Sequence, residues 1–292
     1  MEMQNVTFIG LGVMGYNMAG HIIKNNFNTT VYNRTSSVSE KWVNEFGGES
    51  KTTPGEASSN ADIVCICVGR DEDLISVMEG NDGVIKNIKD NTIIIDHTTA
   101  SADIARKYYQ LGKESNFSFL DAPVSGGQAG AENGILSVMV GGDQDQFDNA
   151  KSVMSAYGKT IELIGNAGSG QLAKMINQIC IAGLVQGLSE AMAFGKKANL
   201  DMEKVLQVIS KGAAQSWQME NRYKTMLKGE YEFGFAVDWM RKDLSICFNE
   251  AEKNGASLPV TKIVDKYYEE VQNNGGSRYD TSSLMTLVDD KQ

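Results

Sequence analysis

The stretch NVTFIGLGVMGYNMAG, residues 5–20, decides the fold of the first half of the chain. The apolar run Val6–Ile9 leads into the hexamer Gly10–Gly15, which reads GxGxxG, and a segment of helical length follows. In a strand–turn–helix unit the first glycine permits the tight turn, the second lets a pyrophosphate approach, and the third lets helix and strand pack closely. The helix N-terminus adds N–H groups for the phosphates. We therefore expect a dinucleotide to bind at Gly10, Leu11, Gly12, Val13, Met14 and Gly15.

The rest of the first half alternates short apolar runs with stretches of helical length. The runs are Val6–Ile9, Thr29–Tyr32, Ile63–Val68, Thr92–Ile95, Phe117–Leu120, Leu136–Val140 and Thr160–Ile164. The helical stretches are Gly15–Asn25, Val38–Phe46, Glu72–Met78 and Ala102–Leu111. This alternation is typical of βαβ units, and runs that are apolar at every position are typical of strands buried on both faces. The pattern predicts an α/β domain with a mostly parallel sheet.

The pattern changes after the glycine-rich segment 165–170. From Gln171 to Ala198 apolar residues recur every three or four positions, which predicts one helix about 40 Å long at ~1.5 Å per residue. Asp201 is expected to cap the next helix. Further helical patterns cover Ser216–Leu227, Asp238–Asn254, Val260–Asn273 and Thr281–Asp289. We therefore expect two domains, a nucleotide-binding domain at 1–165 and an all-α domain at 166–292.

Composition narrows the function classes. The 292 residues carry a net charge of −10, from 27 Lys+Arg and 37 Asp+Glu. This balance gives no general reason to bind nucleic acid or an anionic membrane. The four cysteines and two histidines show no metal-ligand spacing, so no metal is expected. The N-terminus has no signal-peptide pattern, and we expect a cytoplasmic protein.

The last two residues of the second apolar run and the three that follow it read VYNRT, residues 31–35. An NAD-binding unit normally places an acid there to bind the ribose hydroxyls, and this segment has none. Arg34 offers a planar fork that can pair with a 2′-phosphate. We therefore expect NADP in preference to NAD, with contacts from Asn33, Arg34 and Thr35. The alternative is an exposed arginine in a polar loop.

A serine and two glycines, Ser125, Gly126 and Gly127, follow the fifth apolar run in the segment DAPVSGG. Two glycines after a serine expose consecutive backbone N–H groups, and such a nest suits a carboxylate or a phosphate. The sequence therefore predicts an anion-binding turn. An ordinary glycine turn is the alternative.

Two of the lysines in the helical half, Lys174 and Lys242, are candidate functional residues. Lys174 and Asn177 are three residues apart on the expected long helix and share a face. A lysine just past the glycine-rich break can serve as a proton donor, and a solvated helix lysine is the alternative. Lys242 and Asp243 lie in an apolar helical stretch, where a solvated charge pair is the default interpretation.

In this order, GLGVMG, NRT, DAPVSGG, GxxxKxxN and KDL resemble the β-hydroxyacid dehydrogenase family. That family includes 3-hydroxyisobutyrate dehydrogenase, tartronate semialdehyde reductase and the glyoxylate/succinic semialdehyde reductases. The resemblance covers essentially the whole chain. It implies an N-terminal Rossmann domain and an all-α domain joined by a long helix. It also implies an NAD(P)-dependent oxidoreductase that interconverts a small 3-hydroxy acid and its semialdehyde, as a homodimer or homotetramer.

The resemblance also implies roles at the reacting end of the substrate. Lys174 looks like the family's general acid/base, which protonates the carbonyl oxygen as hydride arrives. Asn177 matches the asparagine that helps to hold the reacting oxygen. The turn Ser125–Gly127 matches the segment that grips the substrate carboxylate.

Other residues resemble the family's cofactor and pocket positions. Thr99 falls where the family has a threonine or serine close to nicotinamide and substrate. Lys242 matches a lysine that lies over the cofactor, and Asp243 is its neighbour. Phe235 falls where some members place an aromatic side chain facing the substrate. Val68, which ends the third apolar run, is also expected to contact the cofactor.

Alternatives stay open within the family and outside it. Within it, the substrate could be tartronate semialdehyde, glyoxylate, succinic semialdehyde or a serine-like compound, and no role is predicted for Ser216, Trp217 or Arg222. Tyr109 and Lys113 match the Tyr-x-x-x-Lys pair of short-chain dehydrogenases, but the glycine spacing does not. The helical half is too small for 6-phosphogluconate dehydrogenase, and imine reductases usually replace the lysine of GxxxK. A nucleotide-binding module without catalysis is the alternative from a different class.

Overall fold

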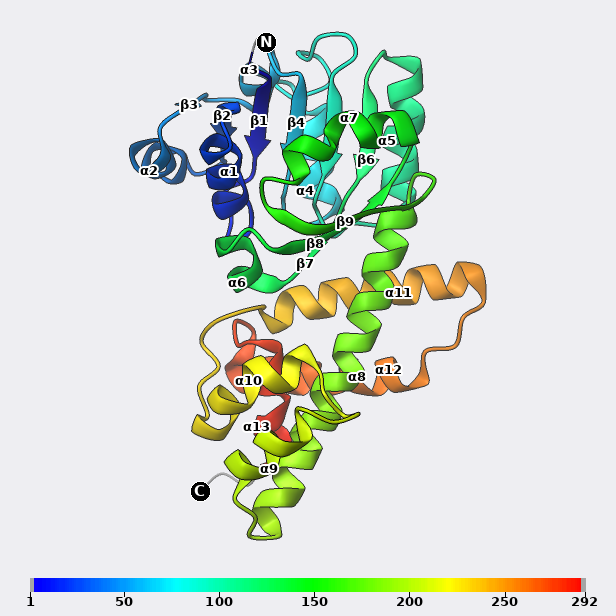
Figure 1. Cartoon of the computed structure of the whole chain (residues 1–292). Helices are drawn as coiled ribbons and strands as arrows, with labels where there is room; N and C mark the ends of the chain where they lie inside the picture. Colours follow the sequence, from blue (N-terminus) through cyan, green and yellow to red (C-terminus); the bar gives the residue numbers. More distant parts are fainter. Residues whose placement is uncertain (1–2, 290–292) are drawn as a thin grey trace. The chain divides into compact units, whose positions relative to one another are not determined.

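The computed structural model describes residues 3–289, and its contacts divide the chain into two compact units (Figure 1). The division falls between Lys174 and Met175. The sequence placed it earlier, at 165/166, where the last strand does end at Gly165. The difference arises because the first turns of the long helix are bonded to the sheet unit, through Gln171 and Lys174.

The first unit is built on one nine-stranded sheet. Its strands are β1 (Asn5–Ile9), β2 (Asn28–Tyr32), β3 (Glu49–Ser50), β4 (Ile63–Ile66), β5 (Ile93–Asp96), β6 (Ser118–Asp121), β7 (Val124–Ser125), β8 (Leu136–Gly141) and β9 (Gly158–Gly165). The order is β3-β2-β1-β4-β5-β6-β8-β7, with β9 beside β8. All neighbours from β3 to β6 are parallel, whereas β8 runs antiparallel to β6 and β7. The mostly parallel sheet is confirmed.

Helices cover both faces of this sheet. They are α1 (Gly15–Lys24), α2 (Ser36–Phe46), α3 (Pro54–Ser58), α4 (Asp71–Glu79), α5 (Ala102–Glu114), α6 (Gly127–Glu132) and α7 (Gln144–Met154). Successive side chains of a strand point to opposite faces. Accordingly Phe8 packs with residues of α1, α2 and α7, while Ile9 packs with residues of α4 and α5. Two buried layers explain why the central strands are apolar at every position.

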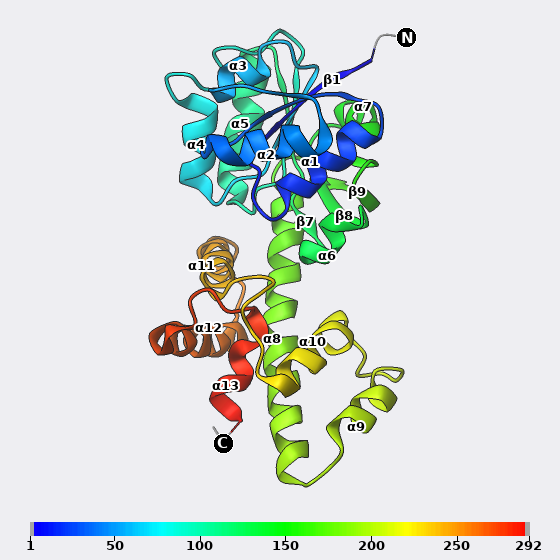
Figure 2. The same ribbon diagram turned by 90° about the vertical axis from the view of Figure 1, so that its left-hand side faces the viewer.

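The second unit is helical. Its elements are the long helix α8 (Ser169–Lys197), then α9 (Met202–Ile209), α10 (Trp217–Lys228), α11 (Val237–Asn254), α12 (Pro259–Val271), the π-helical turn η1 (Gln272–Gly276), the 3-10 turn η2 (Thr281–Leu284) and α13 (Met285–Val288). The later helices pack around the C-terminal part of α8 (Figure 2). Asp201 accepts a hydrogen bond from the Lys204 backbone N–H and caps α9 as expected. Within residues 3–289, no helix combines the length and apolarity needed to cross a bilayer.

Five short or polar elements were not predicted. The strands β3 and β7 contain two residues each, and α3 and α6 contain five and six. Segments this short carry no readable periodicity, so tertiary contacts decide their structure. The helix α7 is longer and buries Phe147, Ala150, Val153 and Met154 at helical spacing, a pattern that sequence reasoning overlooked. The predicted helix 260–273 ends at Val271, where the chain enters the π-helical turn and Gly275 takes a φ of 87°.

Candidate functional site

In the glycine-rich loop after β1, two glycines have no room for a side chain and the third faces open space. A Cβ on Gly10 would lie 2.2 Å from the carbonyl oxygen of Cys67, and one on Gly15 would lie 1.9 Å from the carbonyl oxygen of Gly10. A Cβ on Gly12 would meet no such atom within 4 Å. Packing therefore explains the first and third glycines only. The space beside Gly12 fits a phosphate group that approaches the backbone.

The N-terminus of α1 has neither a side-chain cap nor an acidic residue in its first turn. Met14 is its N-cap residue. Asn33 accepts a hydrogen bond at Oδ1 from the Leu11 backbone N–H at 3.0 Å, and its Nδ2 donates to the Thr35 carbonyl. The asparagine thus ties the end of β2 to the glycine-rich loop, which is a structural role beside the predicted cofactor contact.

Arg34 is exposed at the end of β2, which fits both a ligand contact and the alternative of an exposed arginine in a polar loop. Its side chain is 89% exposed, and Nη1 lies 3.6 Å from Oδ1 of Asp73. Asp73 belongs to the first turn of α4, which also holds Asp71 and Glu72. Thr35 forms the N-cap of α2 without a side-chain bond. The sequence missed Asp73 because it comes from a distant helix.

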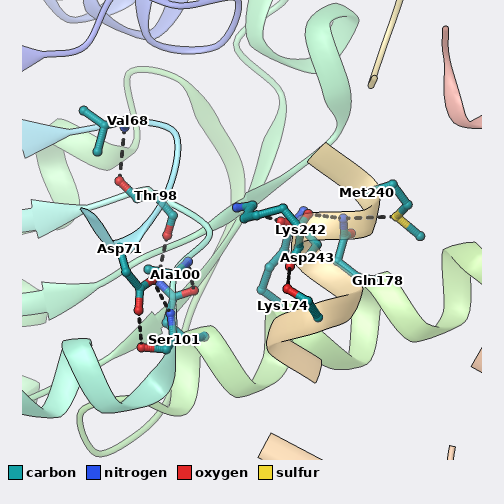
Figure 3. Close-up of polar contacts among 12 residues, drawn as sticks. Val68, Asp71, Thr98, Ala100, Ser101, Lys174, Gln178, Met240, Lys242 and Asp243 are labelled. Atoms are coloured by element: carbon teal, nitrogen blue, oxygen red, sulfur yellow. Dashed lines mark hydrogen bonds and ion pairs between the residues drawn. The ribbon is translucent and has the colours of Figure 1, made fainter. Parts of the chain in front are cut away.

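The loop after β5 is held from both sides. The Val68 backbone N–H donates to Oγ1 of Thr98 at 3.1 Å, and Val68 Cγ1 would lie 3.2 Å from a Cβ on Gly10 (Figure 3). Thr98 is buried, and the predicted Thr99 next to it is half-buried. The Gln171 side chain donates to the Thr98 carbonyl and accepts from the Ala100 N–H. Sequence reasoning missed Thr98 and Gln171.

The turn Ser125–Gly127 links β7 to α6. Gly126 and Gly127 have φ values of 135° and 62°, which favour glycine strongly over other residues. A Cβ on Gly126 would lie 3.0 Å from Leu136 Cδ2, whereas one on Gly127 would face open space. The backbone conformation therefore explains both glycines, and Gly127, like Gly12 in the first loop, lies beside free volume.

Lys174 lies beside this turn. Its residue is 8% exposed, and Nζ donates to the carbonyl oxygen of Val124 at 2.9 Å (Figure 3). Val124 immediately precedes Ser125, so the structure brings the predicted proton donor to the predicted anion turn. The alternative of a solvated helix lysine is wrong, because the side chain is buried.

Two buried carboxyl groups lie at the ends of β5 and β6. Asp121 accepts hydrogen bonds from the N–H groups of Gly168 and Gln171, at 2.7 and 2.9 Å, and so caps the start of α8. Burial raises the pKa of Asp121 to about 6. Burial also raises the pKa of Asp96 to about 7, and Asp96 accepts from the Thr98 N–H. These acids hold the loops that carry the predicted site residues.

In the second unit, four polar side chains form a chain of contacts. Asn177 Nδ2 donates to Gln178 Oε1 at 2.7 Å. Gln178 Nε2 donates to Asp243 Oδ2 at 2.6 Å (Figure 3). The other oxygen of Asp243 lies 2.8 Å from Lys242 Nζ. Lys242 and Asp243 are mostly buried, so their default interpretation as a solvated pair is wrong. Gln178 connects Asn177 with them.

The aromatic segment before α11 has a structural explanation. The Phe235 backbone N–H donates to Asp280 Oδ2, and the Phe235 side chain packs against a buried cluster of the helical unit. Arg222 pairs with buried Asp280 at 3.1 Å and stacks on Trp217. Ser216 caps α10 by accepting from a backbone N–H. These contacts assign roles to three residues that sequence patterns left open.

The Tyr-x-x-x-Lys pair that suggested a short-chain dehydrogenase serves another purpose. Tyr109 and Lys113 donate to the two oxygens of Asp143, at 2.7 and 2.6 Å. Both side chains are thereby held at the surface of the first unit. Among residues 3–289, no cluster of His, Cys, Asp and Glu has the arrangement of a metal site.

Comparison with known families gives two matches that together cover most of the chain. Residues 5–165 match the family described as the NAD binding domain of 6-phosphogluconate dehydrogenase. Residues 168–288 match the family described as the NAD-binding domain of NADP-dependent 3-hydroxyisobutyrate dehydrogenase. The two matches meet at the glycine-rich segment before α8.

Individual relatives align over nearly their full length. The chain is 57% identical to an uncharacterized oxidoreductase of Shewanella frigidimarina, over 98% of this chain and 99% of the relative. It is 32% identical to 2-hydroxy-3-oxopropionate reductase of Escherichia coli, over 97% of this chain and 96% of the relative. The crystal structure of 3-hydroxyisobutyrate dehydrogenase from Salmonella typhimurium superposes with a TM-score of 0.87 at 26% identity, covering 97% of this chain and 99% of that one.

Proposed function

The chain belongs to the 3-hydroxyisobutyrate dehydrogenase family of NAD(P)-dependent β-hydroxyacid dehydrogenases, and from that premise we propose its reaction. We propose that it interconverts a small 3-hydroxy acid and its semialdehyde, with Lys174 as general acid/base. One observation carries this proposal: the buried Lys174 ammonium lies 2.9 Å from the Val124 carbonyl, directly before the turn Ser125–Gly127. A proton donor and an anion-binding turn are thereby adjacent, as a small carboxylated carbonyl substrate requires.

In this mechanism the protein binds, orients and protonates. The turn Ser125–Gly127 holds the substrate carboxylate through backbone N–H groups and so fixes the position of the carbonyl. Lys174 donates a proton to the carbonyl oxygen as the alcohol forms, and it removes that proton in the oxidation direction. Asn177, one helical turn later on α8, helps to hold the same oxygen. The bound nicotinamide coenzyme supplies or accepts the hydride.

We propose that the coenzyme is NADP in preference to NAD. Support comes from the exposed Arg34 guanidinium and from the absence of an acid at the end of β2. Residues of the loop Gly10–Gly15 would hold the pyrophosphate, and Lys242 would contact the coenzyme as its family position implies. Asp73 beside Arg34 would moderate the preference by repelling a 2′-phosphate.

The substrate is the least constrained part of the proposal. 3-Hydroxyisobutyrate and methylmalonate semialdehyde are our first choice. Tartronate semialdehyde is the second, because the Escherichia coli relative is named for that compound, 2-hydroxy-3-oxopropionate. The homodimeric or homotetrameric state and the cytoplasmic location stay predictions.

The test is NADPH and NADH oxidation with a panel of carboxylated aldehydes, comparing the wild type with Lys174→Ala. The panel holds methylmalonate, tartronate and succinic semialdehydes and glyoxylate. We expect turnover with one or two of them, preference for NADPH, and loss of turnover in the variant. Tight NADPH binding without turnover on any panel member would contradict the proposed reaction.

A further inference from the structure

The first turn of α8 contains a buried glutamine, Gln171, three residues before Lys174. We propose that Gln171 is a positioning residue for the reaction: it ties α8 to the loop Thr98–Ala100 and thereby places the Lys174 ammonium. This inference rests on the proposed function of Lys174. It adds a residue that no motif indicated and gives it a role of its own.

The Gln171 side chain uses both ends of its amide. The residue is 1% exposed; Nε2 donates to the Thr98 carbonyl at 2.7 Å, and Oε1 accepts from the Ala100 N–H at 3.1 Å. A donor and an acceptor in one planar group match a carbonyl and an N–H two residues apart. Glutamate can accept but cannot donate once ionised, and alanine can do neither. The loop therefore specifies an amide at this position.

The backbone of Gln171 is fixed as well. Its N–H donates to Asp121 Oδ2 at 2.9 Å, while the other carboxylate oxygen takes the Gly168 N–H. A Cβ on Gly170 would lie 2.4 Å from the Met139 carbonyl and 2.5 Å from the Asp121 carbonyl, so the helix start lies tight against the sheet. The first turn of α8 is thus held by Asp121 on one side and by the Thr98–Ala100 loop on the other.

Lys174 is the next residue along this face. Residues three apart on a helix lie on the same side, separated by about 4.5 Å along the axis at ~1.5 Å per residue. Any rotation or tilt of the first turn therefore moves the Lys174 stem relative to Val124, to which its ammonium is bonded. Proton transfer tolerates errors of only about 0.5 Å, and a displacement of ~1 Å can cost on the order of 100-fold in rate.

The same loop reaches the coenzyme side of the first unit. Thr98 Oγ1 accepts from the Val68 N–H, and the Val68 side chain lies beside Gly10. Gln171 consequently links the proposed acid/base to the strand ends that border the glycine-rich loop, without belonging to that loop. Its loss should move Lys174 while the residues that hold the pyrophosphate stay in place.

The experiment uses three variants of the full-length protein, Gln171→Ala, Gln171→Glu and Gln186→Ala. Gln186 is the matched control, because it is also buried on α8 but its side chain donates to Glu190 of the same helix and not to a loop of the sheet. For each variant we would measure kcat, KM, the NADPH dissociation constant and the unfolding midpoint, with kcat followed from pH 5 to 9.

We expect Gln171→Ala to lower kcat by roughly 10- to 100-fold, as a displaced proton donor would. NADPH affinity and the kcat of Gln186→Ala should stay close to wild type. Gln171→Glu should regain kcat toward low pH, because a protonated carboxyl can again donate to the Thr98 carbonyl. This pH rescue compares one folded protein with itself, so it stays decisive if Gln171→Ala does not fold.

A kcat of Gln171→Ala near that of wild type would overturn the inference, and so would a Gln171→Glu pH profile parallel to wild type. Equal losses in Gln171→Ala and Gln186→Ala would also overturn it, because they would indicate general destabilisation of α8. Lys174→Ala separates the two hypotheses. If that variant retains turnover, the proposed function fails; if it loses turnover while Gln171→Ala does not, only the positioning role fails.

Discussion

Two mostly buried lysines, one in each unit, hold their ammonium groups against different partners. Lys174 in the first unit donates to the neutral carbonyl oxygen of Val124 at 2.9 Å. Lys242 in the second unit lies 2.8 Å from a carboxylate oxygen of Asp243, whose side chain is almost fully buried. Sequence patterns gave both lysines the same default, a solvated surface charge, and the structure separates them.

The two partners differ in how easily each lysine could give up its proton. Proton donation by Lys174 exchanges a hydrogen bond to a neutral oxygen for one to the substrate. If Lys242 gave up its proton, the buried Asp243 carboxylate would lose a cation, and an uncompensated buried charge is costly. This contrast agrees with the proposed function, in which Lys174 transfers the proton and Lys242 keeps its positive charge.

The largest expected effect follows replacement of Lys174. Lys174→Ala should lower kcat by roughly 10²- to 10⁴-fold, the range typical of a lost general acid/base. NADPH affinity should change little, because the glycine-rich loop is untouched. Steady-state kinetics and a fluorescence titration with NADPH measure the two quantities. A variant that binds NADPH poorly but keeps its kcat would reverse the comparison between the two lysines.

Lys242→Ala should instead act on stability. Removing one member of a buried ion pair typically costs about 3–5 kcal/mol, and the partial exposure of Lys242 points to the lower end. The double variant Lys242→Met/Asp243→Asn should recover most of that loss, since no charge is left unpaired. Urea unfolding of the wild type and both variants tests this. Equal stability of the single and double variants would mean that the pair is not coupled.

Coenzyme preference should respond to the charges at the end of β2. Arg34→Asp removes the proposed 2′-phosphate partner and adds repulsion, so NADPH affinity should fall far more than NADH affinity. Asp73→Asn should have the opposite and smaller effect, because an exposed pair with Arg34 is worth only about 0–1 kcal/mol. Dissociation constants for both coenzymes provide the measurement. Equal losses for NADPH and NADH in Arg34→Asp would refute the NADP preference.

The buried carboxyl groups of the first unit predict a modest pH dependence of stability. Burial raises the pKa of Asp96 to about 7 and of Asp121 to about 6, and it lowers the pKa of His97 to about 4. Between pH 4.5 and 6 the folded state keeps both carboxyl protons that the unfolded chain loses, whereas His97 is protonated mainly in the unfolded chain. The folded state therefore binds about one proton more than the unfolded chain. The free energy of unfolding should consequently fall as pH rises, by about 1.4 kcal/mol per pH unit at most.

Asp96→Asn sharpens that prediction. It removes one of the two carboxyl groups whose pKa is raised. The remaining effects of Asp121 and His97 on stability oppose each other, so the free energy of unfolding should depend little on pH between 4.5 and 6. Urea unfolding of the wild type and the variant at pH 4.5, 5 and 6 measures the two slopes. An unchanged slope in the variant would mean that folded Asp96 is already ionised in this range, so that burial does not raise its pKa.

Local patterns predicted much of the fold and part of the candidate site. The loop Gly10–Gly15 was predictable because strand, glycine spacing and helix are contiguous in the sequence. The long helix was predictable because nothing stronger than glycine interrupts its apolar spacing. The turn Ser125–Gly127 was recognised for its glycines, which do adopt positive φ values.

Contacts between distant residues were not predictable in this way. Gln171 bonds to residues about 70 positions earlier, and Asp73 approaches Arg34 from another helix. Gln178 meets Asp243 only after α8 and α11 have packed. A glutamine inside a helical pattern carries no local signal, because its role depends on the partner that folding brings to it.

The central claim is that Lys174 supplies the proton, and chemical rescue tests it most directly. The measurement is the turnover of Lys174→Ala with NADPH and its preferred semialdehyde, in increasing concentrations of small primary amines. We expect the rate to rise with amine concentration and to depend on the pKa of the amine, while the wild type does not respond. A Lys174→Ala enzyme that turns over like the wild type without any amine would contradict the claim.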